Sequence, residues 1–236
     1  MPSPPPQPIS SRRKWRHRSL NPFTPSLRLF NNGNRHAPPL LAQSGPALRP
    51  VARRVIESFH KPPTGLAERA RATLGTSLAV GRVHSAGTWS DVRVHHQISA
   101  ALDPELVPAL RPRFEWYLCR GAFFHTDAHF ADVLFGVWCV SGPPAELVFA
   151  RAGLRVAVAP GTLIVFDPFE VHGVLRPGAA AYRADDYLDA ETSIFVGFEV
   201  ELSSAVRNRL GMDDFPADAR VVSSSTRVSA STGTFE

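Results

Sequence analysis

The feature that most constrains the fold is a long series of short apolar segments between residues 114 and 202. Gly and Pro separate these segments, as in Ser141-Gly-Pro-Pro and Pro160-Gly161. Short strands joined by tight turns are typical of antiparallel sandwiches and barrels and disfavour a parallel sheet. The expected strands are Phe114–Cys119, Val133–Val140, Leu147–Ala150, Leu154–Ala159, Thr162–Phe166, His172–Leu175 and Ser193–Leu202.

Helices and further strands are expected on both sides of this series. Residues 51–75 and Asp103–Leu110 contain helix-forming patterns, and Leu202–Leu210 is expected to form a closing helix. The apolar pattern shifts toward a period of two in Leu78–Val83 and Val92–Ile98, which predicts strands there. The sequence thus predicts a mainly β domain with flanking helices.

The composition divides the chain into three parts. Residues 1–50 are rich in Pro, Ser, Arg and Asn, and such a stretch buries too little apolar surface to offset its ordering entropy. We predict a disordered arm at residues 1–50, a folded domain at residues 51–221 and a flexible tail at residues 222–236.

The positive charge of the chain lies in its N-terminal part. Residues 1–60 contain ten Lys and Arg against one acid, whereas residues 61–236 contain sixteen Lys and Arg against twenty acids. Besides simple disorder, three interpretations of the arm stay open. It can be a targeting or secretion segment, an arm that binds nucleic acid or another anionic surface through Arg12–Arg18, or sequence added by a misassigned start codon.

Cysteine content and hydropathy indicate the compartment. Cys119 and Cys139 both lie in apolar, strand-like segments, which favours buried free thiols over a disulfide framework or a zinc site. No apolar run approaches the length of a membrane span. A reducing, cytoplasmic location is therefore expected, although the arm leaves secretion or organelle targeting open.

Two histidines and a carboxylate lie next to the apolar segments. His125 and Asp127 are two positions apart, so on a strand they face the same side, and His172 follows another predicted strand. Two imidazoles and a carboxylate form the facial ligand set of non-heme iron(II), although zinc can use the same ligands. His129 is an alternative ligand, which would give a site of three histidines as in cupins.

In this region the sequence resembles the 2-oxoglutarate/iron(II)-dependent dioxygenases, particularly the prolyl-hydroxylase-like branch. The resemblance covers roughly residues 114–200. It lies in the pattern Tyr-x3-Gly-x3-His-x-Asp, in the later Gly-x-Leu-x-x-Phe-x5-His, and in the closing strand Ser193–Leu202. The resemblance implies a double-stranded β-helix, or jelly roll, with iron at one mouth of the barrel and 2-oxoglutarate as cosubstrate.

The resemblance also implies how 2-oxoglutarate is held. In this family a basic residue about ten positions after the second histidine pairs with the distal carboxylate of the cosubstrate. Arg183 follows His172 by eleven positions and is the candidate, with Arg176 as the alternative. Tyr117 is expected to add a hydrogen bond to the same carboxylate. Residues 184–192 separate Arg183 from the last strand and resemble an insertion.

The expected function is that of an iron(II)- and 2-oxoglutarate-dependent dioxygenase, with His125, Asp127 and His172 on the metal and no catalytic residue beyond these ligands. It would hydroxylate or oxidatively demethylate a small-molecule or peptide substrate with O2. Two alternatives remain: a cupin-like metal oxygenase that uses no 2-oxoglutarate, and a non-catalytic jelly-roll binding protein with a basic arm. No membrane partner is expected, and the acidic domain gives nucleic acid only weak support as a partner.

Overall fold

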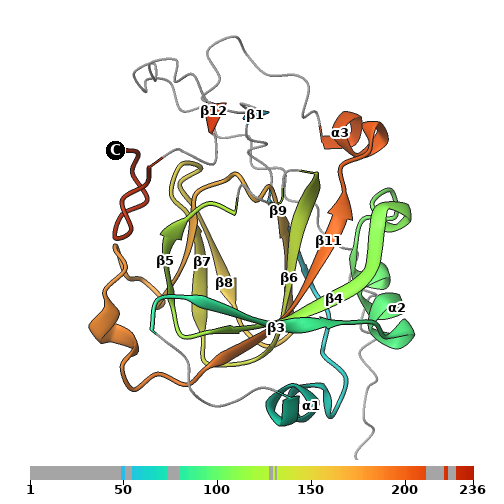
Figure 1. Ribbon diagram of the computed structural model, residues 1–236, viewed down its shortest axis with the longest axis horizontal. Helices are drawn as coiled ribbons and strands as arrows, with labels where there is room; N and C mark the ends of the chain where they lie inside the picture. The colour runs from blue at the N-terminus through green and yellow to red at the C-terminus, as the bar shows by residue number, and fades with distance from the viewer. Residues whose placement is uncertain are drawn as a thin grey trace, which may run out of the picture.

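Two antiparallel sheets face each other and enclose the core (Figure 1). The computed structural model describes residues 49–50, 55–73, 80–127, 130, 132–210, 221–222 and 227–236. The larger sheet has the strand order β2-β9-β6-β11-β4-β3, and the smaller has the order β5-β10-β7-β8. Their strands are β2 (Val55–Phe59), β3 (Val83–Trp89), β4 (Leu110–Cys119), β5 (Ala122–His125), β6 (Val133–Ser141), β7 (Ala145–Phe149), β8 (Leu154–Val158), β9 (Thr162–Phe166), β10 (His172–Leu175) and β11 (Ser193–Glu201).

Strands β4 to β11 form a double-stranded β-helix. The chain passes from β4 in the larger sheet to β5 in the smaller sheet and returns in β6. Strand β11 pairs with both β4 and β6, and β10 pairs with both β5 and β7. Such pairings between strands distant in sequence are those of a jelly roll. The predicted mainly β, jelly-roll fold is confirmed.

Strand β9 illustrates why the barrel strands appear in the sequence as nearly continuous apolar segments. All of its residues are buried, because both faces of the larger sheet are covered. Ile164 and Phe166 belong to the cluster between the sheets. Leu163 and Val165 point the other way and belong to a second cluster, which also contains Ile98 of a covering helix. Side chains alternate between the faces of a strand, so a strand covered on both faces is apolar along most of its length, as β9 is after Thr162.

Among the described residues, three α-helices accompany the sheets: α1 (Leu66–Thr73), α2 (Val92–Ala101) and α3 (Ser204–Leu210). The predicted strand at Val92–Ile98 was wrong, because this segment forms α2 outside β4 (Figure 1). The Asp91 carboxylate accepts hydrogen bonds from the N–H groups of Arg93 at 2.9 Å and Val94 at 3.1 Å, which caps the helix. The period-two pattern is too short here to exclude a helix that buries Val94 and Ile98.

The other predictions for the flanking segments have mixed outcomes. Of the described part of residues 51–75, α1 is helical as predicted, whereas Val55–Phe59 forms β2 and pairs along β9. Asp103–Leu110 contains the short 3-10 helix η1 (Val107–Ala109), and the closing helix is α3. The strand predicted at Leu78–Val83 begins instead at Val83 within the described residues.

The loop after β10 and the C-terminal segment pack beside β5. In the loop, a second 3-10 helix, η2 (Ala184–Tyr187), places the Tyr187 ring on that of Tyr182, with 5.5 Å between their centroids. Residues 227–236 form a small hairpin. The Phe124 N–H of β5 donates to the Ala230 carbonyl at 2.9 Å, and the Tyr182 N–H donates to the Ser231 carbonyl at 2.9 Å. The sequence placed these residues in a flexible tail.

The remaining predictions concern the basic arm, the two cysteines and membrane-spanning segments. The basic arm at residues 1–50 lies outside the described residues, except for β1 (Arg49–Pro50), which pairs with β12 (Val221–Val222). Cys119 and Cys139 are buried free thiols, as predicted, and burial raises the pKa of each to about 12. No helix in the described ranges is long and apolar enough to cross a membrane.

Candidate metal centre

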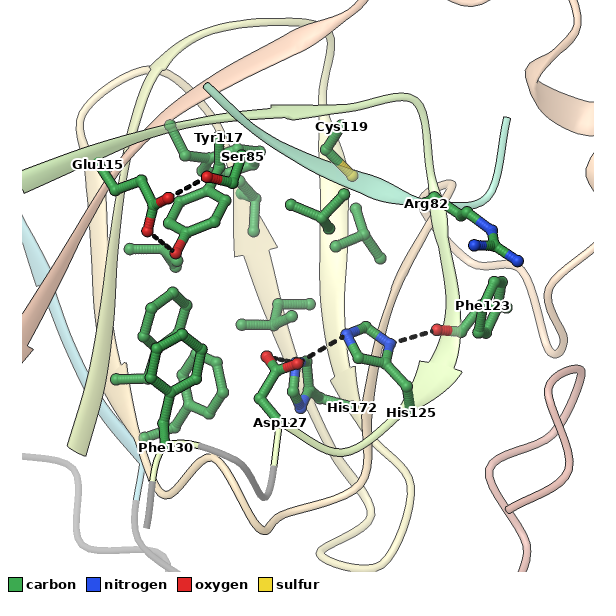
Figure 2. A pocket seen from close by; sticks show the side chains of 18 of the residues that line it. Arg82, Ser85, Glu115, Tyr117, Cys119, Phe123, His125, Asp127, Phe130 and His172 are labelled. Atoms are coloured by element: carbon green, nitrogen blue, oxygen red, sulfur yellow. Dashed lines mark hydrogen bonds and ion pairs between the residues drawn. The ribbon is translucent and has the colours of Figure 1, made fainter. Parts of the chain in front are cut away.

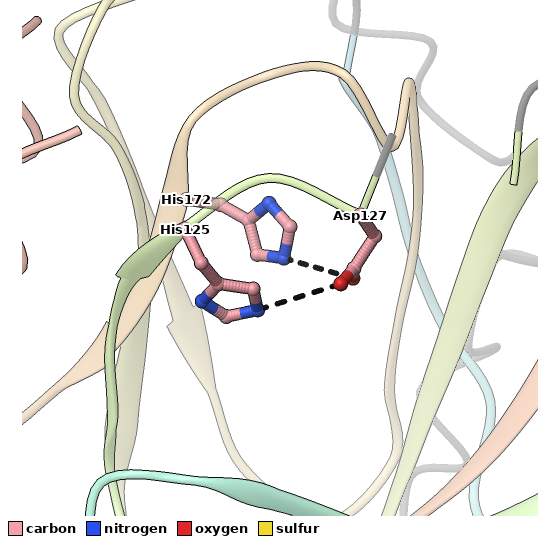
Figure 3. Close-up of side chains that lie close together, drawn as sticks. All are labelled: His125, Asp127 and His172. Carbon is pink, nitrogen blue, oxygen red and sulfur yellow. Dashed lines mark ion pairs between the residues drawn. The ribbon is translucent and has the colours of Figure 1, made fainter. Parts of the chain in front are cut away.

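The three predicted ligands converge at one end of the smaller sheet (Figure 3). His125 is the last residue of β5 and His172 the first of β10, and the two are direct partners in the antiparallel register. Asp127 follows β5 and is anchored by its N–H, which donates to the Pro168 carbonyl at 2.7 Å. A single strand pairing therefore brings His125 and His172 together, although they are 47 positions apart in the sequence.

Backbone hydrogen bonds fix the orientation of both imidazoles. His125 Nδ1 lies 2.7 Å from the Phe123 carbonyl oxygen, and His172 Nδ1 lies 2.8 Å from the Glu170 carbonyl oxygen. Because a carbonyl oxygen only accepts, each Nδ1 must carry the proton, and each neutral ring then keeps a lone pair on Nε2. Both Nε2 atoms thus have the form that binds a metal ion.

The distances between the ligand atoms suit one metal ion. Asp127 Oδ1 lies 3.8 Å from His125 Nε2, and Asp127 Oδ2 lies 3.5 Å from His172 Nε2. All three ligand atoms lie within 4.8 Å of one another. A metal bound at about 2.1 Å from each ligand needs them roughly 3 Å apart. Two imidazoles and one carboxylate leave further coordination positions facing the cavity.

Metal affinity is expected to fall as the pH is lowered through the pKa of His172. Burial alone lowers this pKa, but the hydrogen bond and charge of Asp127 outweigh it, so in the metal-free protein the pKa is raised above 6.5. Protonated Nε2 cannot bind metal, so the loss of metal affinity should begin above pH 6.5. Metal titrations at a series of pH values on both sides of 6.5 test this prediction. The control is His96→Ala, because His96 lies on the exposed face of α2. A constant affinity down to about pH 5.5 would contradict the prediction.

A cavity of about 550 Å³ extends from the three ligands into the barrel (Figure 2). Its walls are mostly apolar and come from both sheets. Such a wall excludes water and leaves few polar groups to orient a bound molecule. The apolar lining residues are Val83, Phe123, Phe130, Phe135, Val137, Leu147, Val158, Phe166, Val174 and Phe195.

A polar cluster of Glu115, Tyr117 and Ser85 lies on the wall away from the three ligands (Figure 2). The Tyr117 hydroxyl donates to Glu115 Oε2 at 2.5 Å, and the Ser85 hydroxyl donates to Glu115 Oε1. Burial and the bond to Glu115 raise the pKa of Tyr117 far above its ordinary value, so the hydroxyl keeps its proton. Gly197 of β11 makes room for the ring, because a Cβ there would lie 2.0 Å from Tyr117 Cε2.

The structure does not bring Arg183 to this cavity. Arg183 is exposed at the start of η2, in the loop that leaves the barrel after β10, and Arg176 is exposed with its guanidinium 5.9 Å from the Tyr187 ring centroid. Neither lines the cavity, whereas Tyr117 does. Arg82 is the only cation among the described lining residues. The alternative ligand His129 lies outside the described residues.

Sequence reasoning missed Glu115, Ser85 and Arg82. A signal for Glu115 was present, because it lies two positions before Tyr117 and residues so spaced on a strand face the same side. Arg82 and Ser85 had no such signal, since their approach depends on the pairing of β3 with β4.

No protein-family model and no curated protein matches the sequence. Among solved structures, the fold is similar to that of a Pseudomonas putida prolyl-4-hydroxylase, with 17% sequence identity and a TM-score of 0.40. The match covers 63% of this chain and 93% of the other.

Proposed function

We propose that the protein is a mononuclear iron(II)-dependent oxygenase with His125, Asp127 and His172 as its metal ligands. The observation that supports it is the convergence of two Nε2 lone pairs and a carboxylate at the end of an apolar cavity. Iron in such a site supplies the activation of O2. The donor set fits iron(II), because the carbonyl groups at Nδ1 fix the tautomer in which each neutral imidazole presents the lone pair of Nε2.

The protein's own part is to position the substrate and exclude water. The two histidines are fixed through Nδ1, and Asp127 is fixed through its backbone N–H. Phe166 packs against His172 with 4.7 Å between ring centroids, which keeps that side of the centre apolar. A substrate in the cavity would thus meet the metal in a dry site, where reactive species are protected from water.

Of the expected features, the binding of 2-oxoglutarate is the one that the residues of the cavity wall support least. Its distal carboxylate needs a cation and hydrogen-bond donors. The hydrogen bond predicted from Tyr117 is already used, because the Tyr117 hydroxyl donates to the Glu115 carboxylate. A second carboxylate beside Glu115 would be repelled. Arg82 is the described lining cation that can take the role predicted for Arg183. An iron oxygenase without 2-oxoglutarate is the second candidate, and Glu115 is the observation that favours it.

Anaerobic titration of the metal-free protein with iron(II), with and without 2-oxoglutarate, tests these alternatives. We expect one iron per chain in both cases. A visible charge-transfer band that requires 2-oxoglutarate and disappears in Arg82→Ala would assign the anchor to Arg82. A band lost in Arg183→Ala instead would restore the sequence prediction. Iron binding without a band supports the second candidate. If no iron binds, the proposed oxygenase is contradicted, and this is the result that a non-catalytic jelly-roll binding protein would give.

A further inference from the structure

The cluster of Glu115, Tyr117 and Ser85 is a second polar site in the same cavity. Both Glu115 oxygens accept a hydroxyl hydrogen bond. A carboxylate has about four acceptor positions, so Glu115 can accept further donors. Within the part of the chain that the structure describes, Glu115 forms no ion pair, unlike Glu199 of the same sheet, which pairs with Arg111.

Folding alone gives little reason for a carboxylate at this position. The neighbouring positions of β4 that face the other way, Phe114 and Trp116, are buried in the apolar cluster under the helices. Glu115 is half-buried, and its two partners are neutral hydroxyls that do not balance its charge. A partly desolvated negative charge with spare acceptor capacity favours a positively charged, hydrogen-bond-donating ligand.

Aromatic rings next to the cluster favour the same kind of ligand. The Tyr117 ring meets Phe135 edge-on at 5.6 Å, and Phe130 stacks on Phe135 at 5.4 Å between centroids. All three rings line the cavity. Aromatic faces attract organic cations, and they also pack against the apolar body of a ligand.

The charges within the cavity also determine which way a cationic ligand would be oriented in it. A divalent metal on two neutral histidines and one carboxylate leaves a net positive centre, which repels a cation. Figure 2 shows Arg82 on the far side of the cavity from Glu115, so its positive charge does not neutralise the cluster directly. A cationic group is therefore favoured at Glu115, and the apolar remainder of the ligand extends toward His125 and His172.

We propose that Glu115, assisted by Tyr117 and Ser85, binds an ammonium or guanidinium group of the substrate, so that the substrate class is an organic amine or guanidine with an apolar body. That the metal centre then oxidises this body rests on the proposed function. Binding of the cation does not depend on that function, and the two are tested separately.

The test compares three probes of similar size: 2-phenylethylammonium, 2-phenylethanol and phenylacetate. Their dissociation constants are measured by calorimetry under anaerobic conditions, with the metal-free protein and with the protein loaded with iron(II). We expect the ammonium probe to bind at least tenfold more tightly than phenylacetate. We also expect Glu115→Gln to weaken ammonium binding about tenfold and to leave 2-phenylethanol nearly unchanged, because a glutamine keeps the size of the side chain but not its charge.

Glu199→Gln is the matched control. Glu199 lies on β11 of the same sheet and pairs with Arg111 at 2.6 Å, and it does not line the cavity. It should leave all three dissociation constants unchanged. Equal binding of the ammonium and carboxylate probes to the wild-type protein would overturn the proposal without reference to any variant. An ammonium preference that survives Glu115→Gln would also overturn it. Selective ammonium binding by a protein that takes up no iron would support this inference while contradicting the proposed oxygenase.

Discussion

His172→Ala should weaken iron(II) binding by at least about 100-fold. Loss of a group that merely orients a metal ligand costs 10- to 100-fold in affinity, and His172 is expected to be a ligand itself. Its side chain is buried at 6% exposure, so water cannot easily replace the lost imidazole in the same geometry. The measurement is an anaerobic titration with iron(II), repeated with cobalt(II), whose absorption reports the ligand geometry.

His96→Ala is the control for this prediction, because His96 is exposed on α2 and far in sequence from the three ligands. It should bind metal as the wild-type protein does. Unchanged affinity in His172→Ala would contradict the assignment of the metal centre. Circular dichroism of both variants would establish that the barrel is intact, since one side chain at the start of β10 leaves the sheet pairing in place.

Trp138→Ala should destabilise the fold by about 3–5 kcal/mol. Trp138 of β6 is fully buried at 0% exposure, and its Nε1–H donates to the His60 carbonyl at 2.8 Å. The substitution leaves a large void beneath the helices and removes the hydrogen bond that ties the segment after β2 to the larger sheet. Urea unfolding followed by circular dichroism measures the change in the free energy of unfolding.

Two further substitutions separate the contributions to this loss. Trp138→Phe keeps most of the ring volume and leaves the His60 carbonyl without its donor, so we expect roughly 1–2 kcal/mol. Val92→Ala removes a side chain that is 87% exposed on α2 and should change stability by less than about 0.5 kcal/mol. A loss below about 1 kcal/mol in Trp138→Ala would show that the core beneath the helices contributes little.

The sequence predicted the barrel well because the barrel strands carry their own signal. Buried strands such as Thr162–Phe166 are apolar after their first residue, and turns such as Pro160-Gly161 mark where they begin. The convergence of His125, Asp127 and His172 was predictable for a related reason. His125 and Asp127 are close in sequence, and the jelly-roll order places the strand of His172 beside that of His125.

Other features were mispredicted or missed, because they depend on contacts that the local sequence pattern does not determine. The segment Val92–Ile98 has an alternating pattern that also suits a helix, and the cap supplied by Asp91 decided the outcome. The position of Arg183 depends on where the loop after β10 carries the chain, and sequence spacing does not determine that path. The cluster around Glu115 needed β3 to lie along β4.

The C-terminal hairpin has a consequence for the behaviour of the protein in solution. Strand β5 is a terminal strand of its sheet, and its Phe124 N–H is paired with Ala230 of the hairpin. An uncovered terminal strand offers free backbone groups to which another molecule can add a strand. The hairpin at residues 227–236 covers part of this edge, so we expect it to hinder the addition of a foreign strand at the strand that carries His125.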